Sequence, residues 1–301
     1  MGRVGAHVSA EGGLPAAAAR AVDLRLECLQ VFVGAPQRWN RPELTPTEVQ
    51  SFRGAVARNS LCPIFVHAPY LVNLASKRGD VRALSVISLT SQLAAADAIG
   101  AKGVVVHVGS GGDDAMEQAI TGLRKVLERH TGTAVVILEN DAGSGHRIGR
   151  DFADLGTLLA AVDRDPRVRF CVDTAHSLAA GYEIRTPVGL DETLRTLDAA
   201  VGLARVELLH VNDSKVELGR NVDRHDNLGQ GKIGLDALAR IVTHPLLAHL
   251  PAVLEVPGYE DDGPDRPNVE LLRLLTSGLP TADALDAWRA AFLPPTAPRP
   301  S

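Results

Sequence analysis

Short apolar runs alternate with longer Ala- and Leu-rich stretches along the chain. The short runs are almost continuously apolar, which is typical of parallel strands buried on both faces. They predict strands at 3–8, 28–33, 63–67, 103–107, 134–139, 168–173, 206–211 and 251–256. The longer stretches predict helices at 13–22, 47–59, 79–99, 113–130, 151–162, 190–203, 235–243, 268–276 and 281–292. Eight strands, each followed by helix, predict a (β/α)₈ TIM barrel.

An open, doubly wound sheet would produce the same alternation, but two features favour the barrel. No G-x-G-x-x-G turn follows the first strand, and in six of the eight strands a candidate metal-ligating histidine or acid is the last or second-last residue. A barrel gathers residues from every strand end, whereas an open sheet concentrates its site at one switch point. We expect one barrel domain over 1–293 and a disordered tail over 294–301, where the sequence is rich in proline.

Local signals support two of the predicted helix ends. Thr45, Pro46 and Glu48 have the pattern of an N-cap, a proline at the first helical position and a capping-box glutamate. Gly100 follows a long helical stretch, where a residue in the left-handed conformation commonly ends a helix.

Composition excludes some classes of protein and leaves others open. No apolar stretch is long enough to cross a bilayer, and the first residues lack the apolar segment of a signal peptide. We therefore expect no membrane partner. Cys28, Cys62 and Cys171 are an odd number, and two of them lie in apolar runs, which favours reduced thiols in a cytoplasmic protein. The net charge of −5 argues mildly against a nucleic-acid partner, but three divalent cations would change it to +1.

Imidazole and carboxylate side chains crowd the ends of the predicted strands. Taken singly, His107 could be a core histidine, Asp173 could cap a helix and Glu139 could cap a loop. Taken together, four acids brought into one pocket would repel one another strongly unless cations lay between them. Imidazole and carboxylate suit zinc, manganese or iron. A barrel would therefore build a metal site from nine residues: His67, His107, Glu139, Asp173, His176, His210, Asp223, His225 and Glu255.

Several motifs resemble the endonuclease IV family of apurinic/apyrimidinic (AP) endonucleases, in order and up to about residue 258. They are GAHVSAEGGL at 5–14, HAPYLVNLAS at 67–76, HVGS at 107–110, LEN at 138–140, DTAHSLAAGY at 173–182, HVNDSK at 210–215, VDRHDNLGQGKIG at 222–234 and LEVPG at 254–258. The resemblance implies a TIM barrel with three Zn²⁺ ions, with Mn²⁺ as an alternative at one site. It also implies hydrolysis of the phosphodiester 5′ to an abasic site in duplex DNA, which leaves a 3′-hydroxyl and a 5′-deoxyribose phosphate.

The same resemblance implies a role for each of the nine residues. His67 and His107 would bind the first zinc, and Glu139 would bridge it to the second, which Asp173, His210 and Glu255 would complete. The third and more exposed zinc would be bound by His176, Asp223 and His225. Glu139 and Glu255 are also the candidates for orienting the nucleophile. His7 is expected beside the ligands or at a phosphate, not as a ligand.

The resemblance further implies that loop side chains enter the duplex and help to extrude the abasic nucleotide. Tyr70 and Leu71 are the candidates, with Arg38 or Gln37 from the preceding loop, although Tyr70 could equally pack on the barrel rim. Gln37 stands where the family usually has arginine, which leaves open whether Gln37 or its neighbour Arg38 performs that task. Other departures are Val108 and Gly111 in place of proline and histidine, and Ala175 in place of a frequent cysteine. Further candidates for the DNA backbone are Lys215, Arg224 and Lys232.

Two other functions remain possible from the residues alone. A sugar isomerase or epimerase on a related barrel also uses His, Asp and Glu at strand ends, but it needs fewer ligands than the nine found here. A metal-dependent DNA-binding module without catalysis would bind abasic duplex and leave it intact. We expect a monomeric enzyme that acts on double-stranded DNA containing abasic sites.

Overall fold

Eight parallel strands close into a barrel in this computed structural model, which describes residues 2–39 and 42–293. Around the barrel the strands follow the order β1, β12, β9, β8, β6, β4, β3 and β2. Their bounds are β1 Val4–Val8, β2 Cys28–Val31, β3 Ile64–His67, β4 Gly103–His107, β6 Val135–Glu139, β8 Val168–Asp173, β9 Val206–His210 and β12 Ala252–Leu254. The closed sheet confirms the predicted TIM barrel and excludes the open sheet. The second and last strands are shorter than predicted.

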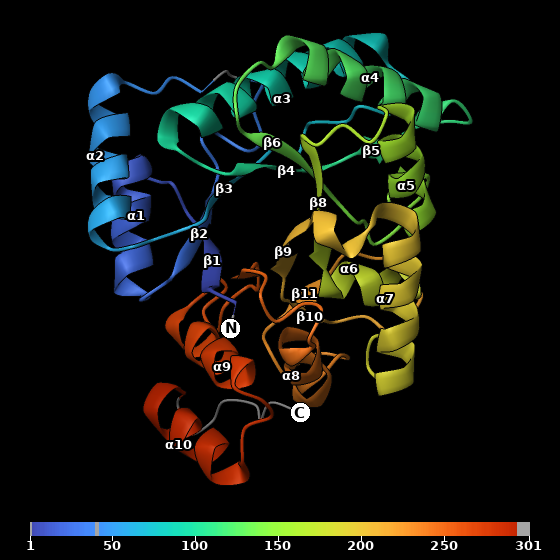
Figure 1. The fold of residues 1–301 in the computed structure, drawn as a ribbon. Coiled ribbons are helices and arrows are strands. Elements are labelled where there is room, and N and C mark those ends of the chain that lie inside the picture. The colour runs from blue at the N-terminus through green and yellow to red at the C-terminus, as the bar shows by residue number, and fades with distance from the viewer. Residues whose placement is uncertain (1, 40–41, 294–301) are drawn as a thin grey trace.

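The helices surround the barrel, as Figure 1 shows, and α10 lies outside α9. All nine predicted helices are present, within three residues of the expected ends: α1 Leu14–Asp23, α2 Pro46–Arg58, α3 Gly79–Ile99, α4 Ala115–Arg129, α5 Phe152–Ala161, α7 Pro187–Val201, α8 Leu235–Thr243, α9 Arg266–Thr276 and α10 Ala282–Phe292. Helix α6 (Thr174–Ala180) and the 3₁₀ turn η1 (Leu203–Arg205) are additional.

Two short antiparallel ribbons lie beyond the barrel strands, and the sequence pattern did not predict them. Strand β5 (Gly109–Ser110) pairs with β7 (Arg147–Ile148), and β10 (Asp213–Ser214) pairs with β11 (His225–Asp226). In the second ribbon Ser214 is opposite His225. Strands of two residues are too short to produce a periodic pattern in the sequence. The β10–β11 ribbon nevertheless brings His225 back toward the end of β9.

Two neighbouring layers of the barrel interior position the site, because side chains two residues apart on a strand point the same way. The lower layer is apolar and takes one residue from each strand: Gly5, Cys28, Phe65, Val105, Ile137, Cys171, Leu208 and Val253. Gly5 is required there because a Cβ at this position would lie 2.4 Å from Cys28 Sγ. Two residues further along every strand the side chain is polar: His7, Gln30, His67, His107, Glu139, Asp173, His210 and Glu255. The apolar layer thus fills the barrel directly below a polar layer, which lies at the carboxyl ends of the strands.

Helix ends agree with the sequence in two places and differ in one. Thr45 Oγ1 accepts a hydrogen bond from the Glu48 amide, and Gly100 ends α3 with φ of 77°. The capping-box role of Glu48 was wrong, because its carboxylate accepts a hydrogen bond from the Leu14 amide at 3.1 Å. That amide is at the N-terminus of α1, where backbone donors have no partner within the helix.

The predicted tail at 294–301 lies outside the described residues. In the part of the chain that the structure describes, no helix combines the length and apolar character needed to span a membrane.

Candidate metal centre

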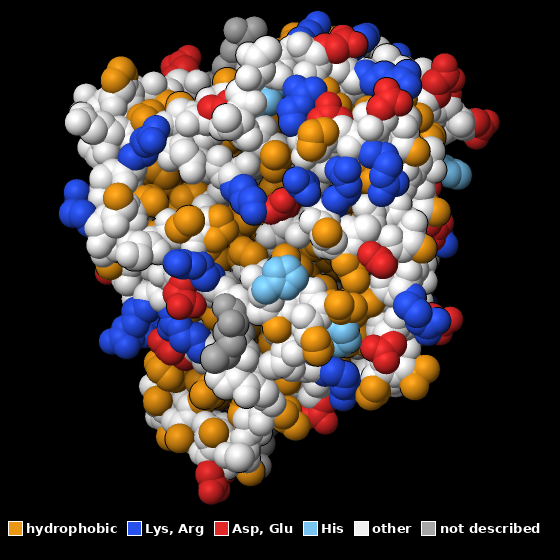
Figure 2. Space-filling model, viewed as in Figure 1, with side chains coloured by type: hydrophobic (Ala, Val, Ile, Leu, Met, Phe, Trp, Pro, Cys, Tyr) orange, Lys and Arg blue, Asp and Glu red, His pale blue; other side chains and the backbone are white. Residues whose placement is uncertain are grey.

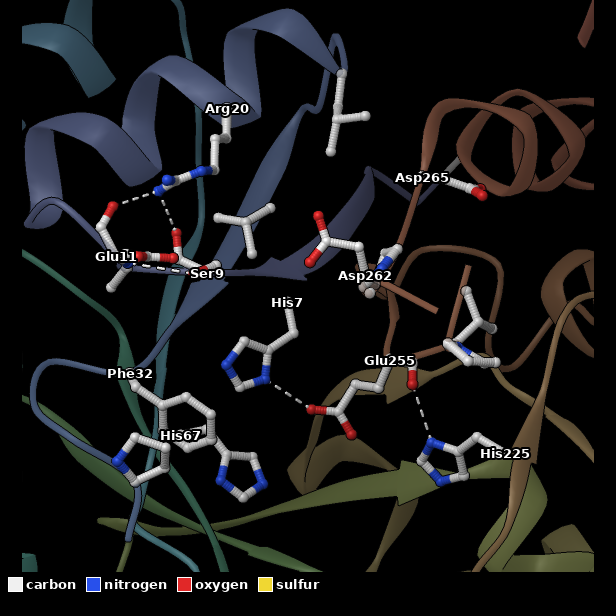
Figure 3. Close-up of a pocket in the computed structure, with 18 of the residues that line it drawn as sticks. His7, Ser9, Glu11, Arg20, Phe32, His67, His225, Glu255, Asp262 and Asp265 are labelled. Carbon is white, nitrogen blue, oxygen red and sulfur yellow. Dashed lines mark hydrogen bonds and ion pairs between the residues drawn. The ribbon is translucent and has the colours of Figure 1, made fainter. Parts of the chain in front are cut away.

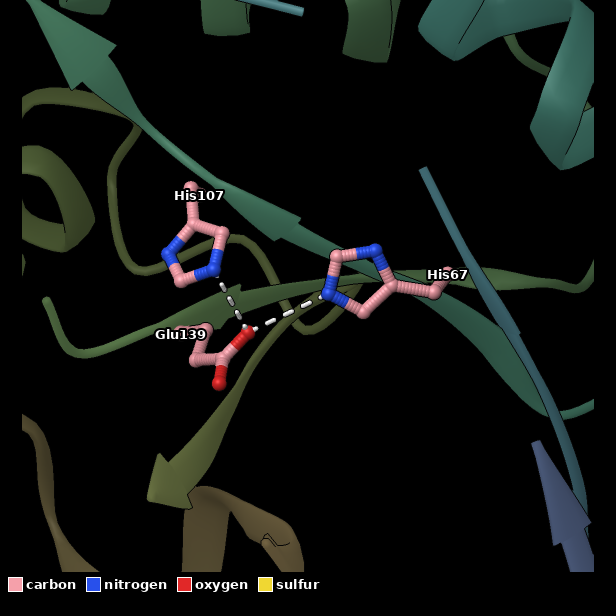
Figure 4. Close-up of side chains that lie close together, drawn as sticks. All are labelled: His67, His107 and Glu139. Atoms are coloured by element: carbon pink, nitrogen blue, oxygen red, sulfur yellow. Dashed lines mark ion pairs between the residues drawn. The ribbon is translucent and has the colours of Figure 1, made fainter. Parts of the chain in front are cut away.

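All nine predicted residues converge at the carboxyl ends of the barrel strands. Five of them are the last residues of their strands, and Glu255 comes directly after β12. The remaining three lie on α6, on β11 and just before β11. The ligand atoms of eight of them form overlapping groups within 4.8 Å of one another, and Asp223 Oδ1 lies 3.3 Å from His176 Nε2 and 3.2 Å from His225 Nε2. Figure 4 shows one group, in which His67 and His107 both point at Glu139.

This first group contains a buried acceptor without a hydrogen bond. His67 Nδ1 lies 2.8 Å from the Ala68 carbonyl oxygen and must carry a proton, so Nε2 of a neutral ring is bare. Nε2 of His67 and Nε2 of His107 each lie 3.4 Å from Glu139 Oε2. Glu139 is fully buried, and this oxygen has no hydrogen-bond partner. The bare Nε2 of His67 and Nε2 of His107 thus both face a carboxylate oxygen that solvent does not reach.

The second group surrounds His210, which is also fully buried. Its Nδ1 lies 2.8 Å from Glu139 Oε1, 3.3 Å from Glu255 Oε2 and 4.0 Å from Asp173 Oδ2. Asp173 is also the N-cap of α6, since its Oδ1 accepts from the His176 amide at 2.8 Å. The Asp173 carboxylate therefore caps the helix with Oδ1 and faces the second group with Oδ2.

The third group is closer to solvent. Nε2 of His176 and Nε2 of His225 are 3.3 Å apart, and Asp223 Oδ1 lies 3.3 and 3.2 Å from them. Both rings use Nδ1 to donate to backbone carbonyls, of Asn140 and of Glu255, so both Nε2 atoms are bare in the neutral form. The Asp223 side chain is 54% exposed. Asp173 Oδ2 also lies 3.6 Å from His225 Nε2, so this group adjoins the second.

The charges of the four acids are balanced only by histidines. Among the described residues, every ion-pair partner of Glu139, Asp173, Asp223 and Glu255 is an imidazole. Burial acts to lower the pKa of His176 and of His210, but the surrounding negative charges outweigh it and raise both well above the usual value. Burial acts to raise the pKa of Glu139, and the neighbouring histidines nevertheless hold it well below the usual range.

These donor sets fit divalent metal ions. Tetrahedral ligands at about 2.1 Å from zinc lie roughly 3.4 Å apart, which is the spacing of the ligand atoms in the first and third groups. Imidazole nitrogen and carboxylate oxygen are suitable ligands. A cation would also satisfy the orphaned Glu139 oxygen and the facing imidazole nitrogens without requiring any of them to move far.

Buried amides hold the acidic ligands in place, and these were not singled out from the sequence. Asn212 donates to Asp173 Oδ2 at 2.6 Å, and its oxygen accepts from the Glu255 amide at 2.7 Å. Asn140 accepts from the Asp173 amide at 2.7 Å. Gln30, with no exposed surface, donates to Glu255 Oε1 at 2.6 Å. A signal for Gln30 was present, because it is the only polar residue in the apolar run CLQVFV.

A carboxylate supports the remaining histidine of the first group. Asp141 Oδ2 lies 3.4 Å from His107 Nδ1 and accepts from Arg147 at 3.0 Å. Burial acts to raise the pKa of Asp141, but His107 and Arg147 bring it below the usual value. His7 Nδ1 lies 2.9 Å from Glu255 Oε1, so His7 contacts a candidate ligand, as expected.

The site opens into a pocket of about 1770 Å³. Six of the nine residues line it, whereas Glu139, Asp173 and His210 are fully buried and do not. Figure 3 shows His7, Glu255 and His225 side by side in this pocket, with Glu11 and Arg20 of the N-terminal region on its wall. The pocket exceeds the roughly 300–1,000 Å³ of a small-molecule site, and it therefore has room for part of a larger substrate.

The four candidate DNA-contacting residues lie on the rim of this pocket or next to it. Tyr70 is 65% exposed, although its ring also contacts Phe32 with centroids 5.4 Å apart. The Tyr70 amide donates to the Pro36 carbonyl at 3.1 Å, which joins this loop to the one that carries Gln37 and Arg38. Both of these side chains are exposed, and Leu71 is partly exposed.

The remaining surface candidates are also accessible. Lys215, Arg224 and Lys232 are exposed, and Lys232 pairs with Glu217 at 3.3 Å. Trp39, which follows Gln37 and Arg38 in the same loop, is partly buried against the core. Figure 2 shows basic and acidic side chains interspersed over the face that it draws. That face therefore has no continuous field of one sign.

Comparisons with known proteins agree with this fold. A family model described as a xylose isomerase-like TIM barrel matches residues 18–277. A protein of Solibacter usitatus described as "Probable endonuclease 4" is 41% identical over 282 residues, which are 91% of this chain and 96% of that protein. The crystal structure of endonuclease IV from Thermus thermophilus has a TM-score of 0.81 at 37% identity, over 91% of this chain and 99% of that chain. The chain belongs to the endonuclease IV family of xylose isomerase-like TIM barrels.

The sugar epimerase alternative is supported by the fold alone. A D-tagatose 3-epimerase-like protein has a TM-score of 0.68 over 96% of this chain, but only 16% of the residues are identical. The chain therefore shares its architecture with such enzymes, while its sequence groups it with the endonucleases.

Proposed function

We propose that this protein is a zinc-dependent AP endonuclease that hydrolyses the phosphodiester 5′ to an abasic site in duplex DNA. The products would be a 3′-hydroxyl and a 5′-deoxyribose phosphate. The observation that supports this most strongly is the set of three adjoining donor groups at the strand ends, in a chain of the endonuclease IV family. A single-metal isomerase would have no use for the His176, Asp223 and His225 group.

The proposed ligands follow the three groups. His67, His107 and Glu139 would bind one ion, Glu139 would be shared with a second, and His176, Asp223 and His225 would bind a third. The second ion would be completed by Asp173, His210 and Glu255. Zinc is proposed at all three positions, with manganese as an alternative at one of them. When bound, such ions supply Lewis-acid activation of the phosphodiester and of a water molecule.

The protein's own contribution is to select the lesion and to orient the reacting groups. Recognition of an abasic site cannot use base edges, because the base is missing. Extrusion of a nucleotide costs a few kcal/mol at an intact pair and less at damage, which favours the abasic position. Tyr70 and Leu71, with Arg38 or Gln37, would insert into the duplex from the rim, and Lys215, Arg224 and Lys232 would contact phosphates. Glu255 and Glu139 would orient the attacking water in line with the departing 3′ oxygen.

Electrostatics permit an acidic protein to bind DNA at this site. The chain has a net charge of −5, and three divalent ions would bring it to +1 while placing the added charge in the pocket. We propose that the enzyme acts as a monomer, because one chain supplies all nine ligands.

The test is incision of a labelled duplex that contains one abasic site. The wild-type protein should nick it and Glu255→Gln should be strongly impaired, since the amide cannot supply the negative charge. Glu128→Gln is the matched control, because Glu128 is an exposed residue of α4 away from the pocket. Failure of the wild type to nick, with metal bound, would refute the proposed function. Equal nicking by wild type and Glu255→Gln would refute the role of Glu255.

A further inference from the structure

Gln30 connects two residues of the second donor group from below. It is the residue that β2 contributes to the polar layer of the barrel interior, beneath the pocket, and its side chain is completely buried. Its Nε2 donates to Glu255 Oε1 at 2.6 Å, and its Oε1 lies 3.0 Å from His210 Nε2. The amide orientation is determined, because the reverse one would put two acceptor oxygens in contact at Glu255.

The first consequence concerns the proton on His210. An amide oxygen only accepts hydrogen bonds, so His210 Nε2 must be the protonated nitrogen. Nδ1 is then the atom left for a metal, and it is the atom that faces Glu139, Glu255 and Asp173. His67, His176 and His225 have the opposite arrangement, because each donates from Nδ1 to a backbone carbonyl.

The second consequence concerns Glu255. Its Oε1 has Gln30 Nε2 at 2.6 Å and His7 Nδ1 at 2.9 Å, whereas Oε2 lies 3.3 Å from His210 Nδ1. One carboxylate oxygen is therefore held by Gln30 and His7, and the other is directed at the same point as His210 Nδ1. A charged donor in place of Gln30 would compete with the cation, but an amide does not.

We propose that Gln30 is a positioning residue that selects the Nδ1 donor of His210 and directs Glu255 Oε2 toward the same metal ion. The inference rests on the proposed metal-dependent function. Groups that orient metal ligands typically contribute 10–100-fold to metal affinity. Loss of the Gln30 amide should therefore weaken one ion of the set by about 10–100-fold and leave the others in place.

The experiment compares Gln30→Met, which keeps the length of the side chain without its polar atoms, with Gln92→Met. Gln92 is a second buried glutamine, 1% exposed on α3. Zinc per chain is measured during competition with a chromophoric chelator, alongside thermal unfolding. Gln30→Met should release one ion at about 10–100-fold lower chelator activity than wild type, and Gln92→Met should not. Equal zinc retention by wild type and Gln30→Met, or equal loss in both variants, would overturn the proposal.

A measurement on the wild-type protein keeps the proposal testable if Gln30→Met does not fold. In ¹⁵N NMR of the zinc-loaded protein, the His210 ring should have its proton on Nε2 and its metal on Nδ1. The opposite assignment would overturn the inference. Neither readout depends on DNA cleavage. A wild-type protein that shows Gln30-dependent zinc binding but leaves abasic duplex intact would refute the proposed function and not this one.

Discussion

Asp213 stabilises the segment that positions the third donor group, and removing its charge should be costly. The carboxylate is fully buried and accepts from the backbone amides of Ser214 and Ile233 at 2.8 Å each, Gly229 at 3.0 Å and Gly234 at 3.3 Å. These bonds hold the loop between β11 and α8 against β10, which pairs with the strand of His225. Asp213→Asn replaces one oxygen by a donor, so one pair of amides would face an N–H group.

The magnitude follows from the bonds that are lost. A buried donor without a partner costs about 1–3 kcal/mol, so two of them set a range of roughly 2–6 kcal/mol. Local rearrangement will recover part of this, and we expect Asp213→Asn to lower the free energy of unfolding by about 2–4 kcal/mol. Because β10 and β11 should loosen together, the variant should also bind less metal at the His176, Asp223 and His225 group.

The assay is chemical unfolding of the metal-free and the zinc-loaded protein, with zinc counted per chain. Asp236→Asn is the control, since Asp236 is an exposed acid at the start of α8 and a surface change is usually within about 0.5 kcal/mol. An Asp213→Asn protein as stable as this control would show that the loop finds other partners. Full zinc binding despite a large loss of stability would show that this loop does not position the third group.

Three further predictions follow from the site. His225→Ala should remove one bound ion of three and leave the first group intact, because among the described residues His225 does not contact His67, His107 or Glu139. Elemental analysis that finds all three ions lost, or none, would contradict this prediction. Tyr70→Phe should incise abasic duplex nearly as well as wild type. Tyr70→Ala should bind this duplex about tenfold more weakly with unchanged protein stability, since a base-sized stacking contact is worth about 1–3 kcal/mol. Equal binding by both variants in a duplex titration would exclude insertion by this ring. The metal-free protein should become less stable as the pH rises above about 6.5. Burial acts to lower the pKa of His107, His176 and His210, but neighbouring acids outweigh burial and raise all three. The stability that these protonated histidines contribute is therefore complete below the unfolded pKa of about 6.5 and is lost as the pH rises through the folded pKa values. Unfolding curves of chelated protein that show rising stability on the alkaline side of that pH would contradict the sign.

The sequence by itself determined the barrel and most of the candidate site. Eight apolar runs, each followed by helix, predict alternating parallel strands and helices, because strands and helices have different hydrophobic periods. The polar residues near the strand ends and the lack of a G-x-G-x-x-G turn then favour the barrel over an open sheet. The position of a polar residue at the end of a run predicts that it faces the opening, because side chains at alternate positions of a strand share a face. His67, His107, Glu139, Asp173, His210 and Glu255 follow this rule, and His176, Asp223 and His225 were included because they come shortly after such strand ends. The family motifs added a role for each residue.

Only the tertiary structure decided which atoms of these residues face one another and what holds them. Gln30 and His210 are 180 positions apart, and their hydrogen bond exists because closure of the barrel brings β2 and β9 to the same interior. Glu48 bonds across to α1 rather than within its own helix, because the packing of α1 on α2 offers it an unpaired amide. A linear pattern records burial and period, whereas the choice of hydrogen-bond partner depends on distances that exist only after the barrel has closed.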